Sequence, residues 1–313
     1  MRRGDFEAAW ALADRELPGP RAADAFTRPR HLQRIWDGRP IDGRRVLVRC
    51  YHGLGDTIQF ARFLPEVARR AAAVVVWAQP ALLPLLATIE SPVELLPLHD
   101  GVPDVAYDVD VEIMELAWLL RTTLATLPAA VPYLHVEPAR PVAPSLDQAL
   151  DPALAVGVVW RAGEWNPARA MTPADASCLT EVPGVRCVAL EPRESAAALA
   201  GWRGEWQPCD SPQALARVVA GLDAVVSVDT MAAHLAGALG VPTCTLLACD
   251  ADWRWMHERD DTPWYPTMRL FRQPAPGVWA PVLADVARHL AASAATATRA
   301  PSMAAARSRH ARA

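Results

Sequence analysis

The chain has 313 residues, a formal net charge of −4 and a pI near 6.1, so its overall charge gives no reason to expect nucleic-acid binding. All 31 basic residues are arginine, which excludes the lysine chemistry of Schiff bases and P-loops. Six cysteines without C-x-x-C spacing favour buried thiols in a reducing compartment. The N-terminus lacks the apolar core of a signal peptide, and the longest apolar stretch, 74–89, is too short and too broken by prolines to span a bilayer. We therefore expect a cytoplasmic protein without a transmembrane segment.

The first part of the chain alternates between strand-like and helix-like segments. Residues 5–16 have a short helical pattern, followed by a Pro/Arg-rich connector that ends near residue 43. The strands expected after it are 46–50, 74–77, 93–98 and 105–113, and the expected helices are 57–71, 81–89 and 117–126. Four prolines between residues 137 and 153, with little periodicity, predict a linker.

The alternation then restarts. The expected strands are 155–160, 185–190, 224–228 and 243–247, and the expected helices are 174–180, 212–222, 230–239 and 281–292. Two such blocks predict an α/β protein with two Rossmann-like, doubly wound parallel sheets that face a central cleft. The predicted division is a helical N-terminal extension (1–40), a first domain (41–140), a linker (141–153), a second domain (154–292) and a disordered tail (293–313).

A glycine-containing turn follows the first expected strand. Gly53 and Gly55 are expected to permit a tight turn, and an amphipathic segment begins at Asp56. The pattern fails both phosphate-loop templates, because Ile58 replaces a third glycine and no Gly-Lys-Ser/Thr follows. A carboxylate at a helix start is stabilised by the helix dipole but repels phosphate. The turn is therefore predicted to present Asp56 rather than to bind a pyrophosphate.

A second strand-to-helix crossing lies in the second block. Asp229 and Thr230 are at its strand end and helix start, and His234 follows one helical turn later on the same face. A hydroxyl, an imidazole and free N–H groups at a helix N-terminus suit a diphosphate without lysine. The alternative is that Asp229 or Thr230 only caps the helix and His234 fills surface.

Four passages together resemble a known family. They are residues 53–65, 158–160, 225–242, and 252–255 through 264–273. The chain resembles the catalytic region of GT-B glycosyltransferases related to family 9, the lipopolysaccharide heptosyltransferases. It is more similar still to the bacterial family in which this region follows tetratricopeptide repeats. The resemblance spans roughly residues 41–292, and residues 4–10 look like the remnant of a last repeat helix.

The resemblance implies an inverting, metal-independent glycosyltransferase with no cofactor, which uses a nucleotide sugar as co-substrate. Asp56 matches the family's general base, which deprotonates an acceptor hydroxyl on a glycan, a lipid-linked molecule or a protein. Only Arg161 and Arg169 remain basic in the loop after residue 160, where relatives carry more cations, and Glu164 opposes them. The residues that match the family's donor site are Arg169, Glu191, Asp229, Thr230 and His234.

Other acidic residues lie on the expected strand at 105–113. Asp108, Asp110 and Glu112 alternate along it and share one side, which is compatible with a hard cation, although we expect no metal site. A further interpretation places Glu112 and Glu115 at the sheet edge near Asp56. There they would help to bind the acceptor, or raise the pKa of Asp56 as neighbouring like charges.

The segment 253–265 is rich in aromatic residues. Trp253, Trp255, Trp264 and Tyr265 fit structural packing better than stacking on a sugar, and Arg254 is interpreted as solvated. Two other functions stay open beside sugar transfer. One is a non-catalytic sugar-nucleotide-binding or scaffolding module of the same fold, and the other is an isomerase of the GT-B type that acts on the nucleotide sugar itself.

Overall fold

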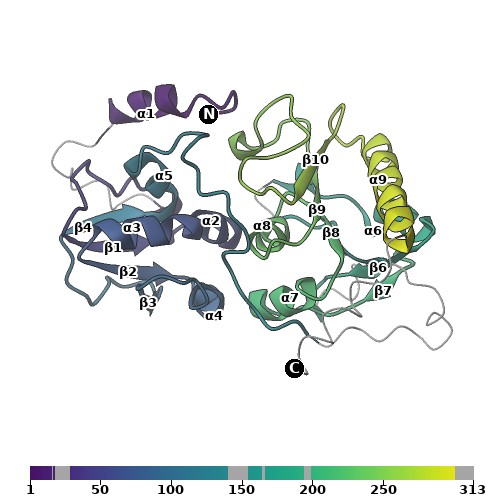
Figure 1. Ribbon diagram of the computed structural model, residues 1–313, viewed down its shortest axis with the longest axis horizontal. Helices are drawn as coiled ribbons and strands as arrows, with labels where there is room; N and C mark the ends of the chain where they lie inside the picture. Colours follow the sequence, from purple (N-terminus) through teal and green to yellow (C-terminus); the bar gives the residue numbers. More distant parts are fainter. Residues whose placement is uncertain (16, 18–28, 140–153, 164–165, 194–198, 300–313) are drawn as a thin grey trace.

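Two parallel β-sheets lie side by side in the computed structural model, which describes residues 1–15, 17, 29–139, 154–163, 166–193 and 199–299 (Figure 1). The first sheet has the order β3-β2-β1-β4. Its strands are β1 (Arg45–Arg49), β2 (Ala73–Ala78), β3 (Glu94–Pro97) and β4 (Val109–Glu112). All neighbours are parallel, and Val46 of β1 pairs with Val74 on one side and Val109 on the other. The strands predicted at 46–50 and 74–77 are confirmed as buried parallel strands, whereas β3 is at most half-buried and β4 is shorter than the predicted 105–113.

The second sheet has the order β10-β9-β8-β5-β6-β7 and is also parallel throughout. Its strands are β5 (Leu154–Val159), β6 (Val185–Ala189), β7 (Glu205–Trp206), β8 (Ala224–Val228), β9 (Thr243–Leu247) and β10 (Met268–Arg272). Counted within this half, the order is the 3-2-1-4-5-6 of a doubly wound sheet. Strand order reverses between β1 and β4 in the first sheet and between β5 and β8 in the second, and ligands bind at such reversals.

Short helices connect these strands. The α-helices are α1 (Phe6–Asp14), α2 (Leu54–Phe60), α3 (Leu64–Arg70), α4 (Leu83–Leu86), α5 (Leu116–Leu119), α6 (Pro173–Ala176), α7 (Pro212–Val219), α8 (Met231–Ala238) and α9 (Ala280–Arg299). The 3-10 helices are η2 (Arg30–Leu32), η3 (Ala61–Phe63), η4 (Pro80–Leu82), η5 (Ile113–Glu115), η7 (Pro167–Arg169), η8 (Ser177–Glu181) and η10 (Trp253–Trp255).

Several predicted boundaries need correction. The single helix expected at 57–71 is broken into α2, η3 and α3, because Pro65 has no N–H to continue the ladder to Ala61. The tail was predicted to begin at residue 293, but α9 continues to Arg299. Residues 300–313 and the predicted linker at 141–153 lie outside the described residues. Residues 133–139, just before it, are bonded to the second half, where the Tyr133 N–H donates to Ala238 and the Ala139 N–H to Arg217.

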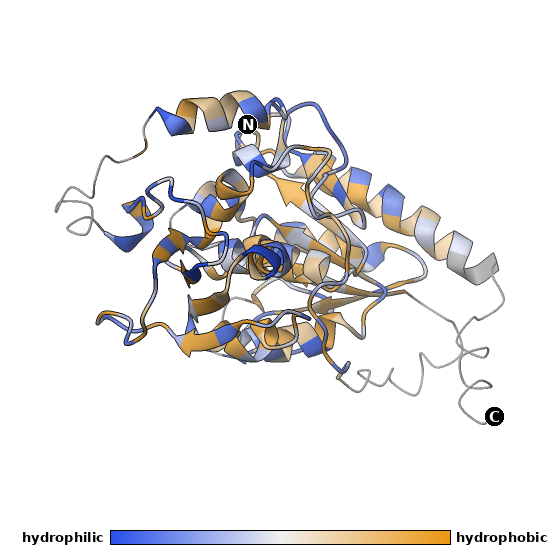
Figure 2. Ribbon diagram, turned by 60° about the vertical axis from the view of Figure 1, so that its left-hand side comes forward, coloured by the Kyte–Doolittle hydropathy of each residue, from blue (hydrophilic) through white to orange (hydrophobic). Residues whose placement is uncertain are grey.

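One apolar core runs through both halves. It joins the first sheet, α2 and α3 to α8 and to residues 253–265 of the second half. Figure 2 shows mostly hydrophobic strands beside helices of mixed hydropathy. Phe60 and Phe63 from the first half meet Trp264 from the second, with ring centroids 5.6 and 6.5 Å apart. The two sheets are therefore parts of one packed body.

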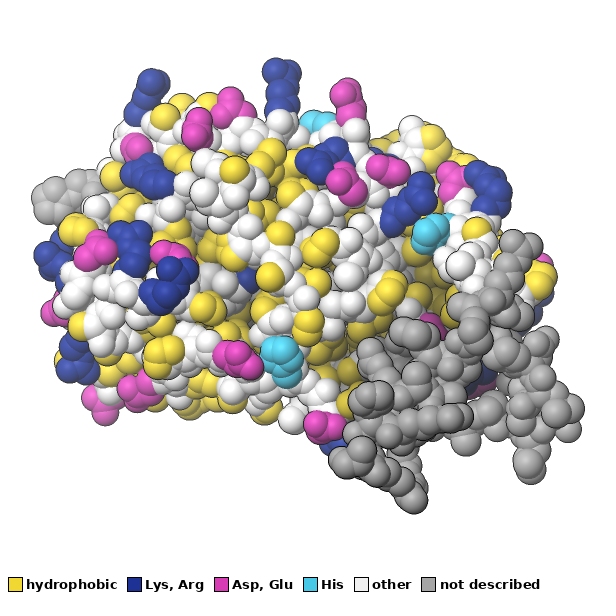
Figure 3. Space-filling model, viewed as in Figure 1, with side chains coloured by type: hydrophobic (Ala, Val, Ile, Leu, Met, Phe, Trp, Pro, Cys, Tyr) yellow, Lys and Arg dark blue, Asp and Glu magenta, His cyan; other side chains and the backbone are white. Residues whose placement is uncertain are grey.

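The N-terminal segment crosses both halves. Phe6 of α1 packs edge-on against Trp253 and Trp264, and the Trp10 indole donates a hydrogen bond to the Thr122 carbonyl at 2.6 Å. Within the described ranges, every helix is too short or too polar to cross a membrane. On the face seen in Figure 3, acidic and basic side chains lie interspersed, in keeping with a net charge of only −4.

Candidate active site

Asp56 lies in the first turn of α2, directly after β1. Gly53 is the N-cap of this helix, and its N–H donates to the Asp56 carboxylate at 3.0 Å. Neither of the two glycines predicted to permit a tight turn has a positive φ, so a left-handed backbone is not what requires glycine here. Instead, a Cβ on Gly55 would lie 2.9 Å from His234 Cδ2 and 3.3 Å from Met231 Cα. Gly55 is needed so that α2 can approach the N-terminus of α8.

Gly55→Ala is therefore expected to destabilise the fold by about 1–3 kcal/mol, because an added methyl group must push α8 away. The midpoint of urea-induced unfolding measures the effect. Gly53→Ala is the matched control, since its Cβ would meet only the flexible Asp56 carboxylate, at 3.2 Å. Equal stability of the two variants would contradict the close-approach explanation.

The second crossing faces Asp56 from the other half. Thr230 is the N-cap of α8, and its side chain makes no capping hydrogen bond, so the capping alternative does not describe it. His234 is buried, with Nδ1 3.1 Å from the Tyr265 hydroxyl and its ring stacked on Trp255. Burial, with nearby arginines, holds the pKa of His234 well below its usual range. His234 is therefore a neutral buried residue rather than surface filling.

Arg169 and Asp229 are held together at the base of this crossing. Arg169 Nη1 donates to the Asp229 carbonyl at 2.6 Å and lies 3.9 Å from the Asp229 carboxylate. Both side chains are largely buried, and burial raises the pKa of Asp229. A cation from the loop after β5 is thus fixed beside the strand end that leads into α8.

Arg254 is one of two charged cavity residues that sequence reasoning missed, and Asp252 is the other. Arg254 was interpreted as solvated, but it is only 7% exposed, because η10 directs it inward between the two halves. Its Nη2 is paired with the Asp56 carboxylate, and its Nη1 donates to Asp252 at 2.8 Å. Burial works against the charge of this arginine, but the surrounding carboxylates keep the pKa of Arg254 raised. The candidate base is therefore ion-paired across the cleft.

These residues share one cavity of about 260 Å³. Seven predicted site residues meet there with two unpredicted ones: Gly53, Gly55, Asp56, Arg169, Asp229, Thr230, His234, Asp252 and Arg254. The cavity lies where the carboxyl ends of β1 and β8 face each other. Such a position is where doubly wound sheets bind ligands.

Glu191 lies in a second cavity of about 300 Å³, which shares Leu54, Thr230 and Met231 with the first. Its side chain is almost fully buried, with Oε2 3.5 Å from Arg161. Among the described residues, Oε1 has no hydrogen-bond partner. Burial raises the pKa of Glu191 from 4.5 to about 7. A buried acid with an unused oxygen can bind a hydroxyl group of a ligand.

This raised pKa makes stability depend on pH. The pKa of Glu191 is higher in the folded state than in the unfolded state. Its contribution to the stability of the fold is therefore fully present below pH 4.5 and is lost as the pH rises through about 7. Glu191→Gln stays neutral at every pH, so it should stabilise the fold by roughly 1–3 kcal/mol at pH 8 and change little at pH 5. Urea unfolding at the two pH values tests this. A stability difference between Glu191→Gln and wild type that is equal at pH 5 and pH 8 would contradict this explanation.

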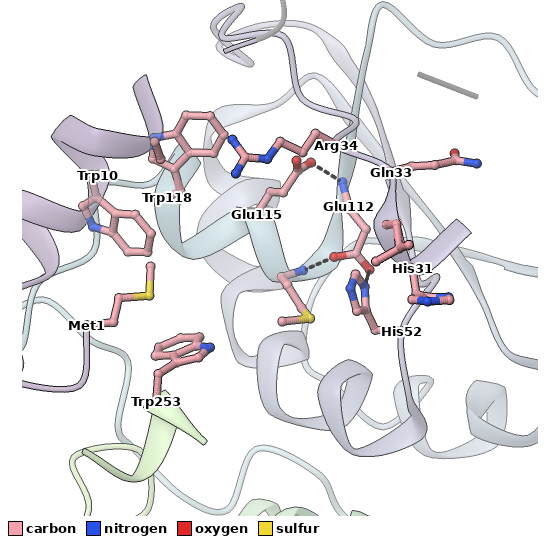
Figure 4. Close-up of a pocket in the computed structure, with 13 residues that line it drawn as sticks. Met1, Trp10, His31, Gln33, Arg34, His52, Glu112, Glu115, Trp118 and Trp253 are labelled. Atoms are coloured by element: carbon pink, nitrogen blue, oxygen red, sulfur yellow. Dashed lines mark hydrogen bonds and ion pairs between the residues drawn. The ribbon is translucent and has the colours of Figure 1, made fainter. Parts of the chain in front are cut away.

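Glu112 and Glu115 line a third cavity, of about 360 Å³, at the carboxyl end of β4 (Figure 4). Their predicted place at this sheet edge is correct, but their oxygens are bonded to the protein itself. Glu115 accepts the backbone N–H groups of Ile35, Trp36 and Glu112. Glu112 accepts those of Tyr51 and Met114 and lies 2.9 Å from His52 Nδ1. Both carboxylates hold the cavity wall in shape, and their role in binding the acceptor stays a prediction.

The other two acids of the predicted strand 105–113 are also engaged, although β4 itself begins only at Val109. Asp108 accepts the Arg45 N–H at 2.8 Å, and Asp110 is paired with buried Arg49 at 2.8 Å. In the part of the chain that the structure describes, no group of three or more His, Cys, Asp or Glu residues is placed to hold a metal ion. Trp255, Trp264 and Tyr265 are buried, as predicted for packing, whereas Trp253 is only partly buried and lines the third cavity.

Two parallel-sheet halves that enclose a cleft at their carboxyl edges define the GT-B class of fold. The chain has the fold of family 9 glycosyltransferases, as the resemblance predicted. It is similar to E. coli ADP-heptose lipopolysaccharide heptosyltransferase II, with a TM-score of 0.53 and 14% identity over 79% of this chain and 98% of that one. It is also similar to the iron-containing dodecameric glycosyltransferase TibC of enterotoxigenic E. coli, with a TM-score of 0.52 and 13% identity over 78% of this chain and 67% of that one. A family 9 glycosyl transferase from Veillonella parvula gives a TM-score of 0.50 at 12% identity over 75% and 87%.

Sequence comparison gives one curated relative. Protein FlbA of Caulobacter vibrioides is 27% identical over 285 residues, which cover 82% of this chain and 48% of FlbA. The chain thus spans about half the length of the curated relative it matches. No protein-family model matches the chain.

Proposed function

We propose that this protein is an inverting, metal-independent glycosyltransferase that moves a sugar from a nucleotide sugar to an acceptor hydroxyl. The observation that carries the proposal is the meeting of Asp56 with Arg169, Thr230 and His234 in one cavity between the two sheets. A carboxylate from one half thus faces a cation and a helix N-terminus from the other. Sugar transfer needs this combination, a base on one side and a site for the leaving diphosphate on the other.

The second half binds the donor in this proposal. The first N–H groups of α8 have no acceptor within the helix and favour an anion, and the Thr230 hydroxyl and Arg169 add donors beside them. The adjoining cavity that contains Glu191 accommodates the nucleoside, whose hydroxyls would use the unpartnered Oε1. ADP is the first nucleotide to test, because heptosyltransferase II, a structural neighbour, is described with ADP-heptose.

The reaction is a single displacement. Asp56 takes the proton of the acceptor hydroxyl while the acceptor oxygen forms a bond to the anomeric carbon of the sugar. The bond from that carbon to the diphosphate oxygen breaks on the opposite face, and the nucleoside diphosphate leaves with the electron pair. Configuration at the anomeric carbon is inverted. The acceptor is a glycan, a lipid-linked molecule or a protein. It would approach from the third cavity, which His52 of the first half and Trp253 of the second half line.

Thermal unfolding with ADP, UDP, GDP and their sugars, in the presence of EDTA, tests the donor site. A ligand at 100 times its Kd stabilises a fold by about 2.7 kcal/mol, so at least one nucleotide should raise the Tm. Arg169→Gln should lose this shift, and Asp261→Asn, which changes an exposed acid outside the cavities, should keep it. No shift with any nucleotide would favour the scaffolding module. A rearranged nucleotide sugar formed without an acceptor would favour the isomerase.

A further inference from the structure

The charges around the central cavity do not suit a diphosphate as they stand. Its wall carries three carboxylates, Asp56, Asp229 and Asp252, against two arginines. His234 adds no charge, because burial keeps it neutral. An incoming diphosphate brings further negative charge, so it needs a cation that can leave its present carboxylate partners.

Arg254 is placed for such an exchange. It comes from the half that is proposed to bind the donor, yet its guanidinium reaches Asp56 on the other half. Its backbone is anchored, since its carbonyl accepts the Trp264 indole N–H at 3.0 Å. Its side chain is nine-tenths buried, and among the described residues the buried Nε has no hydrogen-bond acceptor. The cation therefore has a donor group that its present partners do not use.

We infer that Arg254 binds the diphosphate of the donor and, by doing so, releases Asp56 to act as the base. The inference rests on the proposed function. A guanidinium and a diphosphate match in paired hydrogen bonds, and Nε with one Nη forms the edge that such pairing uses. While the cavity lacks a donor, Arg254 neutralises Asp56. Once the diphosphate takes the guanidinium, the carboxylate loses its partner and can accept the acceptor proton. Arg254 supplies the charge that the cation-poor loop at 161–172 does not.

Competition between Asp56 and the diphosphate for the Arg254 guanidinium predicts the direction in which each variant changes the affinity for nucleotide. Asp56→Asn removes the competing charge, so it should bind ADP more tightly than wild type does, by roughly tenfold. Arg254→Gln should weaken ADP binding by at least about tenfold and AMP binding far less, because the contact is to the second phosphate. In the Arg254→Gln background, Asp56→Asn should leave the affinity unchanged. Titration calorimetry with ADP, UDP and GDP measures all four proteins of this cycle.

Control variants distinguish this exchange of Arg254 partners from a purely structural ion pair. Arg259→Gln removes a similar arginine–carboxylate pair, with Asp261, from the same segment and should not alter affinity. A purely structural pair predicts that Asp56→Asn binds nucleotide as wild type does, or less well. If Asp56→Asn gives that result while nucleotide binding still depends on Arg169, the inference is overturned, but the proposed donor site is retained. Wild-type protein that binds none of the three diphosphates would overturn both. If Arg254→Gln fails to fold, Asp56→Asn still tests the inference, because an affinity for ADP equal to or below that of wild type overturns it.

Discussion

Asp56→Asn is expected to abolish sugar transfer while the nucleotide stays bound. An amide cannot take the proton of the acceptor hydroxyl, and general-base catalysis contributes about 10²- to 10⁴-fold to a rate. The replacement has the same shape, and its oxygen can still accept the Gly53 N–H that the carboxylate now accepts at 3.0 Å. Initial rates of product formation at saturating donor, followed by mass spectrometry, measure the loss.

Asp252→Asn is the matched control for this variant. Asp252 contacts the same Arg254 guanidinium at 2.8 Å and lines the same cavity, but it belongs to the second half and takes no proton in the proposed reaction. The rate of sugar transfer by the Asp252→Asn enzyme should fall far less than that of the Asp56→Asn enzyme. An Asp56→Asn enzyme that keeps more than about a tenth of the wild-type rate would place the base elsewhere. The next candidate would be His52, which lies against Glu112 in the third cavity (Figure 4).

Trp264→Ala is expected to have the largest effect on stability, a loss of about 3–5 kcal/mol. The side chain is 0% exposed and lies where Phe6, Phe60 and Phe63 meet the second half. Its indole N–H also holds the Arg254 carbonyl at 3.0 Å. Removing it leaves a cavity at the junction of the two sheets, so the halves should also lose part of their coupling.

Urea unfolding, followed by circular dichroism, measures this loss. Trp202→Ala is the comparison, because Trp202 packs on Trp160 within the second half alone and is only partly buried. Trp202→Ala should lower the free energy of unfolding clearly less than Trp264→Ala does. A loss below about 1 kcal/mol for Trp264→Ala would mean that the junction relaxes around the cavity and carries little of the stability.

Local sequence signals predicted most of the two sheets. Apolar runs such as 224–228 are buried strands, and the crossings at Asp56 and Asp229 follow from the rule that parallel strands end at one edge. The missed strands had weak signals. β7 has two residues, and β10 alternates arginine with apolar residues in the sequence Met-Arg-Leu-Phe-Arg. Parallel pairing with β6 and β9, which only the fold supplies, identifies these two segments as strands.

Side-chain partners were harder to predict. Arg254 is 198 positions from Asp56, and a lone arginine between tryptophans has no periodic pattern to indicate that it points inward. Glu112 and Glu115 were placed correctly at the sheet edge. The backbone N–H groups that Glu115 accepts include those of residues 35 and 36, which come from a distant connector. The role of Gly55 could not be read from its own turn, because the constraint comes from α8.

The path of the N-terminal segment has a consequence for how an acceptor could be delivered. Met1, Trp10 and Ala13 line the cavity of the first half, so any polypeptide joined before Met1 leaves the fold at the rim of that cavity. A group carried on a short flexible tether there is held at an effective concentration on the order of millimolar. In the proposed function, such a tether would take the place of tight binding of the acceptor itself. An affinity tag at this end would compete for the same opening, so transfer assays should use protein without one.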